Sequence, residues 1–278
     1  MNDRTIPKEI ETHPAFKGYN TGCCGRLVGR MAFVTVFISD SVSKWESASE
    51  MNYKQAENDA ISFLMQSGGV EAGLRVVQRI YYRVALTFEE KREKYNQAVS
   101  AAIHILGFSS FNEMRSSVCK NCSDIDHVAV FFVFNKVDRS FASISNHHKN
   151  IHSTRRSHMF GSEYSVIYAG SKTYLSYSIC HELLHLYGAV DYYYPETVKK
   201  EANKVFLHSI MLDFEGKIHI DEFTKFLIGW SNCLTPKSID FLKNTISTRR
   251  TLRPINSIIQ NTTNRRTVKI KGEQYVNH

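Results

Sequence analysis

The segment CHELLHLYGAVDYYYP, Cys180–Pro195, constrains the fold of this chain more than any other. Together with the residues before it, it predicts a helix over residues 171–188 that Gly188 ends. In such a helix His181 and His185 lie one turn apart on the same face, so both imidazoles can bind one metal ion. Imidazole nitrogens are typical ligands of Zn²⁺, and the spacing therefore predicts a zinc site.

A catalytic zinc ion has three protein ligands and one open position, so a further ligand has to come from outside the helix. Gly188 tolerates a positive φ and lets the chain turn back, which can bring Asp191 to the two histidines. Glu182 points past the metal toward the place of a bound water. The more distant Glu196 and Glu201 are alternative third ligands.

The pattern HELLHLYGAVD resembles the HExxHxxGxxH/D signature of the metzincin zinc peptidases, in the variant that ends in aspartate, as in the snapalysin-like branch. A second motif, HSIMLD at His208–Asp213, resembles the Met-turn of that family, with Met211 as its methionine. The resemblance covers about residues 30–230 and is strongest at the two motifs.

The resemblance implies a zinc-dependent endopeptidase that acts on a protein or peptide. It implies one catalytic Zn²⁺ held by His181, His185 and Asp191. Glu182 would take a proton from the zinc-bound water and deliver it to the leaving amine. Such an enzyme would bind an extended peptide along an edge strand above the metal.

One position departs from the family pattern. Several metzincins carry a tyrosine two residues after the turn methionine, and this chain has Asp213 there. Another tyrosine could fill that role, and the candidates for transition-state or substrate contacts are Tyr187, Tyr192, Tyr193 and Tyr194.

Apolar runs rich in β-branched and aromatic residues predict strands over residues 30–40, 79–86 and 126–135, and shorter extended segments over residues 139–145 and 163–170. A helix is expected around Ile61, Leu64 and Met65. Thr87 and Glu90 form a capping-box pattern that predicts the start of a second helix, which Gly107 ends.

This alternation predicts an α/β (α+β) fold with a twisted, mostly parallel sheet and an antiparallel edge strand. The metzincin resemblance adds an active-site helix and a small, mainly helical C-terminal subdomain. The predicted division is an N-terminal leader at 1–29, a catalytic domain at 30–235 and a basic extension at 236–278. Within the catalytic domain, the upper subdomain spans 30–188 and the lower one 189–235.

The net charge of +8 is concentrated in the extension, which has nine Lys and Arg residues against Asp240 and Glu273. Such a segment could bind nucleic acid or an acidic partner, or remain a solvated tail. An alternative function is therefore a nucleic-acid-associated protein whose zinc centre acts on bound protein or serves structure only. A third hypothesis is a non-catalytic binding module that zinc stabilises.

The N-terminus lacks the apolar core of a secretory signal, and no apolar run approaches the ~20 residues that cross a bilayer. These features predict a cytoplasmic protein, with export by a leaderless route as an alternative.

Four histidines lie close together in one predicted loop: His147, His148, His152 and His158. This loop could bind a second metal ion, or it could be an exposed polar loop. Cys23 and Cys24 could supply a thiolate that blocks the zinc.

Overall fold

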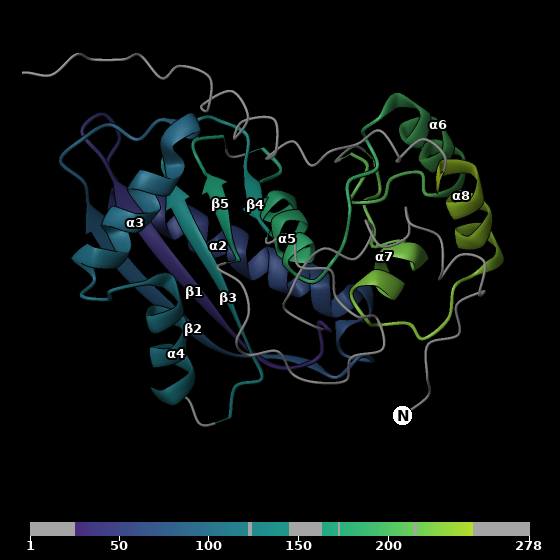
Figure 1. Ribbon diagram of the computed structural model, residues 1–278, viewed down its shortest axis with the longest axis horizontal. Helices are drawn as coiled ribbons and strands as arrows, with labels where there is room; N and C mark the ends of the chain where they lie inside the picture. The colour runs from purple at the N-terminus through teal and green to yellow at the C-terminus, as the bar shows by residue number, and fades with distance from the viewer. Residues whose placement is uncertain (1–25, 122–123, 145–162, 172, 214–215, 247–278) are drawn as a thin grey trace, which may run out of the picture.

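A computed structural model describes residues 26–121, 124–144, 163–171, 173–213 and 216–246 (Figure 1). The strands are β1 (Gly29–Ser39), β2 (Leu74–Ala85), β3 (His127–Phe134), β4 (Phe141–Ser143) and β5 (Tyr164–Tyr168). The α-helices are α2 (Ser47–Leu64), α3 (Tyr95–Ile105), α4 (Phe111–Asn121), α5 (Leu175–Leu186), α6 (Glu196–Val205), α7 (Glu222–Leu227) and α8 (Pro236–Ile246). A π-helical turn, Met65–Gly69, extends α2, and a 3₁₀ turn, Arg92–Lys94, precedes α3.

The five strands form one sheet in the order β2-β1-β3-β5-β4. All neighbouring pairs are parallel except β4 and β5, which are antiparallel. The prediction of a mostly parallel sheet with an antiparallel edge strand is therefore confirmed. The short segment at 139–145 supplies that edge strand, as β4.

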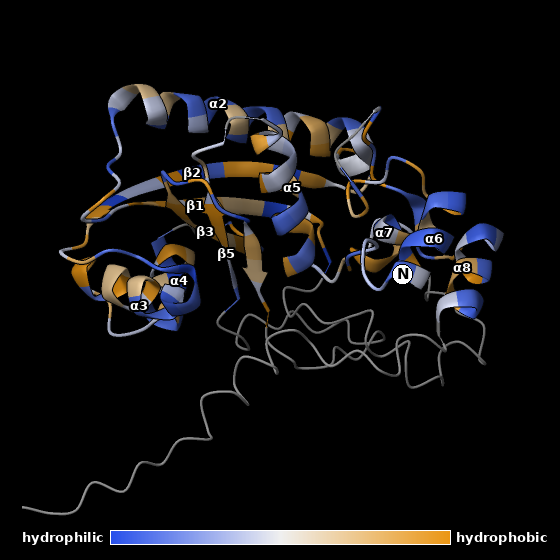
Figure 2. Cartoon of the chain, turned by 90° about the horizontal axis from the view of Figure 1, so that it is seen from above, coloured by the Kyte–Doolittle hydropathy of each residue, from blue (hydrophilic) through white to orange (hydrophobic). Residues whose placement is uncertain are grey.

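Helices cover both faces of the sheet (Figure 2). On β1, Phe33 and Phe37 pack with α2 and α5, whereas Val34 and Val36 pack with α3 and α4 on the other face. Successive side chains of a strand point to opposite faces, so a strand covered on both sides is mainly apolar on both faces. This requirement explains why β1 and β3 lack polar alternation.

The capping-box prediction at Thr87 and Glu90 was wrong. Helix α3 begins at Tyr95, after the 3₁₀ turn, and no cap hydrogen bond comes from Thr87. Glu90 is instead buried, and its carboxylate accepts hydrogen bonds from Tyr168 Oη and Lys136 Nζ. Glu90 thus makes long-range polar contacts, in place of the local helix cap that the pattern predicted. Helix α4 was not anticipated either.

After α5 the chain forms three helices, α6, α7 and α8, that lie beside the sheet (Figure 1). Their aromatic side chains, Phe206, Phe223 and Phe241, pack around the buried ring of Tyr192. Helix α8 lies within the segment predicted as a basic extension, and Phe241 and Leu242 on it are buried. The domain boundaries stay predictions.

Several predicted features fall outside the described residues. These are the paired cysteines at Cys23 and Cys24, the histidines from His147 to His158, and the basic residues from Arg249 onward. Among the helices of the described ranges, none has the length and apolar character needed to cross a bilayer.

Candidate metal centre

Helix α5 carries His181 and His185 on one face, as the sequence predicts. Their Nε2 atoms lie 3.0 Å apart. The Nδ1 atom of His181 lies 2.8 Å from the carbonyl oxygen of Ile210, and that of His185 lies 2.9 Å from the carbonyl oxygen of Ala189. A carbonyl only accepts hydrogen bonds, so both Nδ1 atoms carry a proton and donate it. Both Nε2 atoms are thereby directed toward a common point.

Asp191 reaches the same point because the chain reverses after α5. Gly188 has a φ of 100°, a conformation that glycine adopts without steric cost. The Oδ1 atom of Asp191 then lies 3.1 Å from His181 Nε2 and 3.2 Å from His185 Nε2. Two ligands of one tetrahedral zinc ion stand about 3.3 Å apart, given zinc–ligand distances near 2.0–2.1 Å. The three atoms therefore fit one such ion.

Burial and charge adapt these groups to a cation. Burial alone raises the pKa of Asp191, but the neighbouring His185 and His181 outweigh it and hold that pKa well below its ordinary value. Burial lowers the pKa of His185, yet the Asp191 carboxylate raises it to about 9. The centre therefore favours positive charge at the Nε2 atoms, which a proton or a metal ion can supply.

Glu182 lies beside the two histidines, and one ligand-type atom from each of His181, Glu182 and His185 falls within 4.8 Å of the others. These three residues could hold a metal ion. The Glu182 side chain is buried, and burial is the largest cause of its raised pKa, although His181 and His185 oppose the shift. A carboxylate with a raised pKa is a stronger proton acceptor than that of an exposed glutamate.

The segment His208–Asp213, predicted as a Met-turn, runs against the centre. Its Ile210 carbonyl holds the His181 ring, and its Met211 carbonyl accepts the backbone N–H of Tyr192 at 2.8 Å. Met211 is fully buried. Two neighbouring carbonyls of this segment thus orient one histidine and the residue that follows Asp191.

A buried polar cluster fixes that segment in turn. Asp221 accepts a hydrogen bond from Ser209 Oγ at 2.6 Å and caps α7 through the backbone N–H groups of Phe223 and Thr224. The hydroxyl of Tyr192 contacts Thr224 Oγ1 at 2.8 Å. The C-terminal helices therefore support the centre from the side opposite the sheet.

The four candidate tyrosines occupy different places. The hydroxyl of Tyr187 donates to Met31 Sδ in the core, Tyr192 is buried among the C-terminal helices, and the Tyr194 side chain is 56% exposed. Tyr193 alone of the four lines the cavity beside His181 and Glu182, which has a volume of about 350 Å³. Its ring stacks on His181, and its hydroxyl donates to Asp191 Oδ2 at 2.6 Å.

The alternative third ligands lie elsewhere. Glu201 accepts hydrogen bonds from Lys204 and Asn244, and Glu196 is exposed at the start of α6.

Sequence reasoning missed Arg139, whose guanidinium donates to Tyr193 Oη and lies over that ring at 4.8 Å. No local signal marks this arginine, because a gap of 54 residues separates it from Tyr193.

No protein-family model and no curated protein matches the sequence. Among solved structures, the chain is similar to metalloproteinase-II from Bacteroides fragilis, with 14% sequence identity and a TM-score of 0.33. The similarity covers 69% of this chain and 52% of that protein, so the chain spans about half of its length.

Proposed function

We propose that this chain is a zinc-dependent endopeptidase of the metzincin type. One observation carries the proposal. The Nε2 atoms of His181 and His185 and the Oδ1 atom of Asp191 lie 3.0–3.2 Å from one another, with Glu182 beside them in a cavity. Two imidazoles and one carboxylate form a ligand set that suits Zn²⁺ and leaves its fourth position open.

The residues of this chain would divide the work as follows. His181, His185 and Asp191 would hold the ion, and a bound zinc ion lowers the pKa of water toward about 7 and polarises a peptide carbonyl. Glu182 would accept the proton of the attacking water and pass it to the leaving amine. Its raised pKa supports the first half of this transfer, because it makes the carboxylate a stronger proton acceptor.

Several metzincins carry a tyrosine two residues after the turn methionine, and this chain has Asp213 there. Tyr193 would take the role of that tyrosine. Its hydroxyl is within hydrogen-bonding distance of Asp191 Oδ2, and its ring lies on His181, so it stands at the edge of the centre. In this position its single O–H group would either orient Asp191, to which it donates in this structure, or turn to the developing oxyanion of the substrate.

An extended peptide would bind along β4. This strand is the last in the sheet and pairs with β5 on one side only, among the strands that the structure describes. An unpaired strand edge presents backbone N–H and C=O groups that a peptide can pair with. The substrate would then cross the cavity that Glu182 lines.

The test compares the zinc-loaded wild type with Glu182→Ala on a peptide library, with zinc content measured in both. We expect Glu182→Ala to keep stoichiometric zinc and to lose about 10²–10⁴-fold in cleavage rate, because only the proton transfer is removed. Glu71→Ala, which removes an exposed carboxylate outside the centre, is the matched control. Full activity in Glu182→Ala would contradict the mechanism.

A further inference from the structure

Arg139 is a cation in the cavity that forms no ion pair with a carboxylate among the described residues, although its charge acts on Glu182 and opposes the rise in the pKa of that carboxyl. The side-chain contacts of Arg139 among these residues are with Tyr193, through the hydroxyl and the ring. Neighbouring cations are paired differently: Arg92 lies 3.7 Å from Asp138, and Lys136 lies 2.5 Å from Asp40. Arg139 is exposed and lines the cavity together with His181 and Glu182.

The nearest acidic residue in the chain does not neutralise this arginine. Asp138 Oδ1 accepts the backbone N–H of Arg139 at 2.6 Å, and the same oxygen faces Arg92 Nε. Asp138 Oδ1 is thus shared between the Arg139 backbone and Arg92, although Asp138 lines the same cavity as Arg139. A guanidinium has five N–H donors in a rigid fork, and the contact with Tyr193 Oη uses only part of it.

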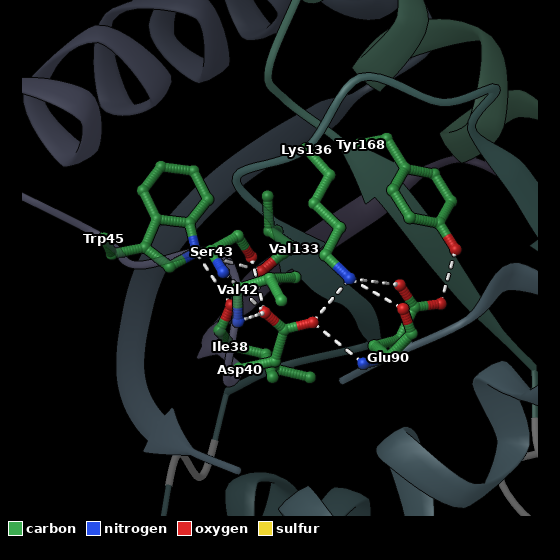
Figure 3. Close-up of polar contacts among 9 residues, drawn as sticks. All are labelled: Ile38, Asp40, Val42, Ser43, Trp45, Glu90, Val133, Lys136 and Tyr168. Atoms are coloured by element: carbon green, nitrogen blue, oxygen red, sulfur yellow. Dashed lines mark hydrogen bonds and ion pairs between the residues drawn. The ribbon is translucent and has the colours of Figure 1, made fainter. Parts of the chain in front are cut away.

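The loop that carries Arg139 is firmly held. Figure 3 shows Lys136 between the carboxylates of Asp40 and Glu90, with Tyr168 Oη donating to Glu90 at 2.7 Å. The Lys136 carbonyl also accepts the backbone N–H of Gly170 at 2.7 Å.

The end of the loop nearer β4 is held as well, because Ser140 Oγ accepts the backbone N–H of Tyr168 at 3.1 Å. Contacts on both sides of Arg139 therefore fix the backbone from which it extends. An anion receptor that is already in position loses less entropy when it binds its ligand.

We propose that Arg139 forms a carboxylate-binding subsite of the catalytic cavity, so that this protein prefers peptides with a carboxylate close to the cleaved bond. The carboxylate can be the free C-terminus of a short peptide or the side chain of an acidic residue. The proposal rests on the proposed peptidase function. Its basis is the position of an arginine fork beside Glu182, oriented by Tyr193 and an anchored loop.

The experiment uses two matched pairs of peptides with the zinc-loaded full chain. One pair differs only in a free or an amidated C-terminus, and the other carries Glu or Gln at the same position of an amidated peptide. For wild type we expect kcat/KM to favour the carboxylate in at least one pair by about tenfold, as a charge-assisted hydrogen bond allows. The pair that responds identifies the source of the carboxylate.

The variants assign this preference to Arg139. Arg139→Gln should reduce the ratio to about one, and Arg139→Lys should retain a part of it, because lysine keeps the charge but lacks the fork. Arg75→Gln removes an exposed arginine from β2, at the opposite edge of the sheet, and should leave the ratio unchanged. Comparing ratios within one variant cancels any general loss of activity that follows from disturbing Tyr193.

A binding measurement separates this proposal from the proposed function. Zinc-loaded Glu182→Ala, with and without Arg139→Gln, is titrated with the same peptides carrying a fluorescent label, and anisotropy gives the Kd ratio for each pair. If wild type cleaves no peptide, the peptidase function fails, and the Kd ratio still decides on the subsite. Equal Kd values within both pairs, or a preference that survives in Arg139→Gln, would overturn the subsite.

Discussion

Two buried polar clusters of this molecule solve the same electrostatic problem in different ways. Around Lys136, two carboxylates are neutralised by a cation that belongs to the chain, and Asp40 and Glu90 are both almost fully buried. Around Asp191, a carboxylate faces the Nε2 atoms of His181 and His185, which become positive only with a proton or a metal ion.

The source of the positive charge distinguishes a cluster that stabilises the fold from one that is suited to chemistry. A cluster that contains its own permanent cation is complete, and it serves to anchor loops at the end of the sheet. A cluster whose positive charge must be acquired responds to its surroundings, and it is suited to binding an ion. Both clusters are rich in charged or ionisable side chains, so composition alone would not distinguish them.

The largest effect expected from this comparison is on metal binding. If Asp191 is a ligand, as proposed, Asp191→Ala should weaken zinc affinity by more than about 100-fold, which exceeds the effect of losing a group that only supports a ligand. Zinc content after dialysis against a competing chelator measures the change. Asp240→Ala, on the exposed face of α8, is the control. Unchanged stoichiometric zinc would remove Asp191 from the ligand set.

The cluster around Lys136 should respond in stability instead. Lys136→Met leaves the buried carboxylates of Asp40 and Glu90 without their cation, so we expect the free energy of unfolding to fall by about 3 kcal/mol. Urea unfolding of the metal-loaded protein measures this loss. Lys225→Met, which breaks the more exposed pair with Glu222, should cost less than about 1 kcal/mol.

Zinc content should stay the same in Lys136→Met. A variant that lost zinc as readily as Asp191→Ala would mean that the two clusters are not separate. A variant that kept both its stability and its zinc would deny the anchoring role.

The smallest effect concerns pH. Burial would raise the pKa of Asp40, but hydrogen bonds from Lys136 and from the backbone outweigh it and lower that pKa to about 2, from an ordinary value of 3.8. A lowered pKa contributes stability above pH 3.8, and this contribution is lost as the pH falls toward 2. The loss should amount to about 2 kcal/mol.

Urea unfolding at a series of pH values between 5 and about 2 tests this expectation. Asp40→Asn should flatten this part of the profile, while Asp240→Asn should leave it as in wild type. An equal acid dependence in wild type and Asp40→Asn would refute the role of Asp40.

The sequence was sufficient for features that depend on local spacing. The two histidines of α5 share a face because a helix repeats every 3.6 residues, and Gly188 predicted the reversal toward Asp191. The parallel sheet followed from apolar strands alternating with helices. In the first two cases the signal lies within one stretch of chain, and in the third it lies in the order of such stretches.

Features that depend on long-range contacts were out of reach. Glu90 resembled a helix cap, and only the fold shows that it pairs with Lys136 across 46 residues. Arg139 is the first residue of a predicted extended segment, and nothing in its neighbourhood indicates a place in the cavity. The four candidate tyrosines could not be separated either, because their surroundings come from segments far away in the sequence, such as β1 for Tyr187 and the C-terminal helices for Tyr192.

The bonds from the two histidines to backbone carbonyls have a consequence for how this protein could vary. The tautomer of each ring is set by the main chain at Ile210 and Ala189, and not by a neighbouring side chain. Many side chains at these two positions would preserve the centre, provided that the backbone path is kept. Distant relatives could therefore differ at both sites and still share this geometry, and the path of the chain would identify them better than the identity of its residues.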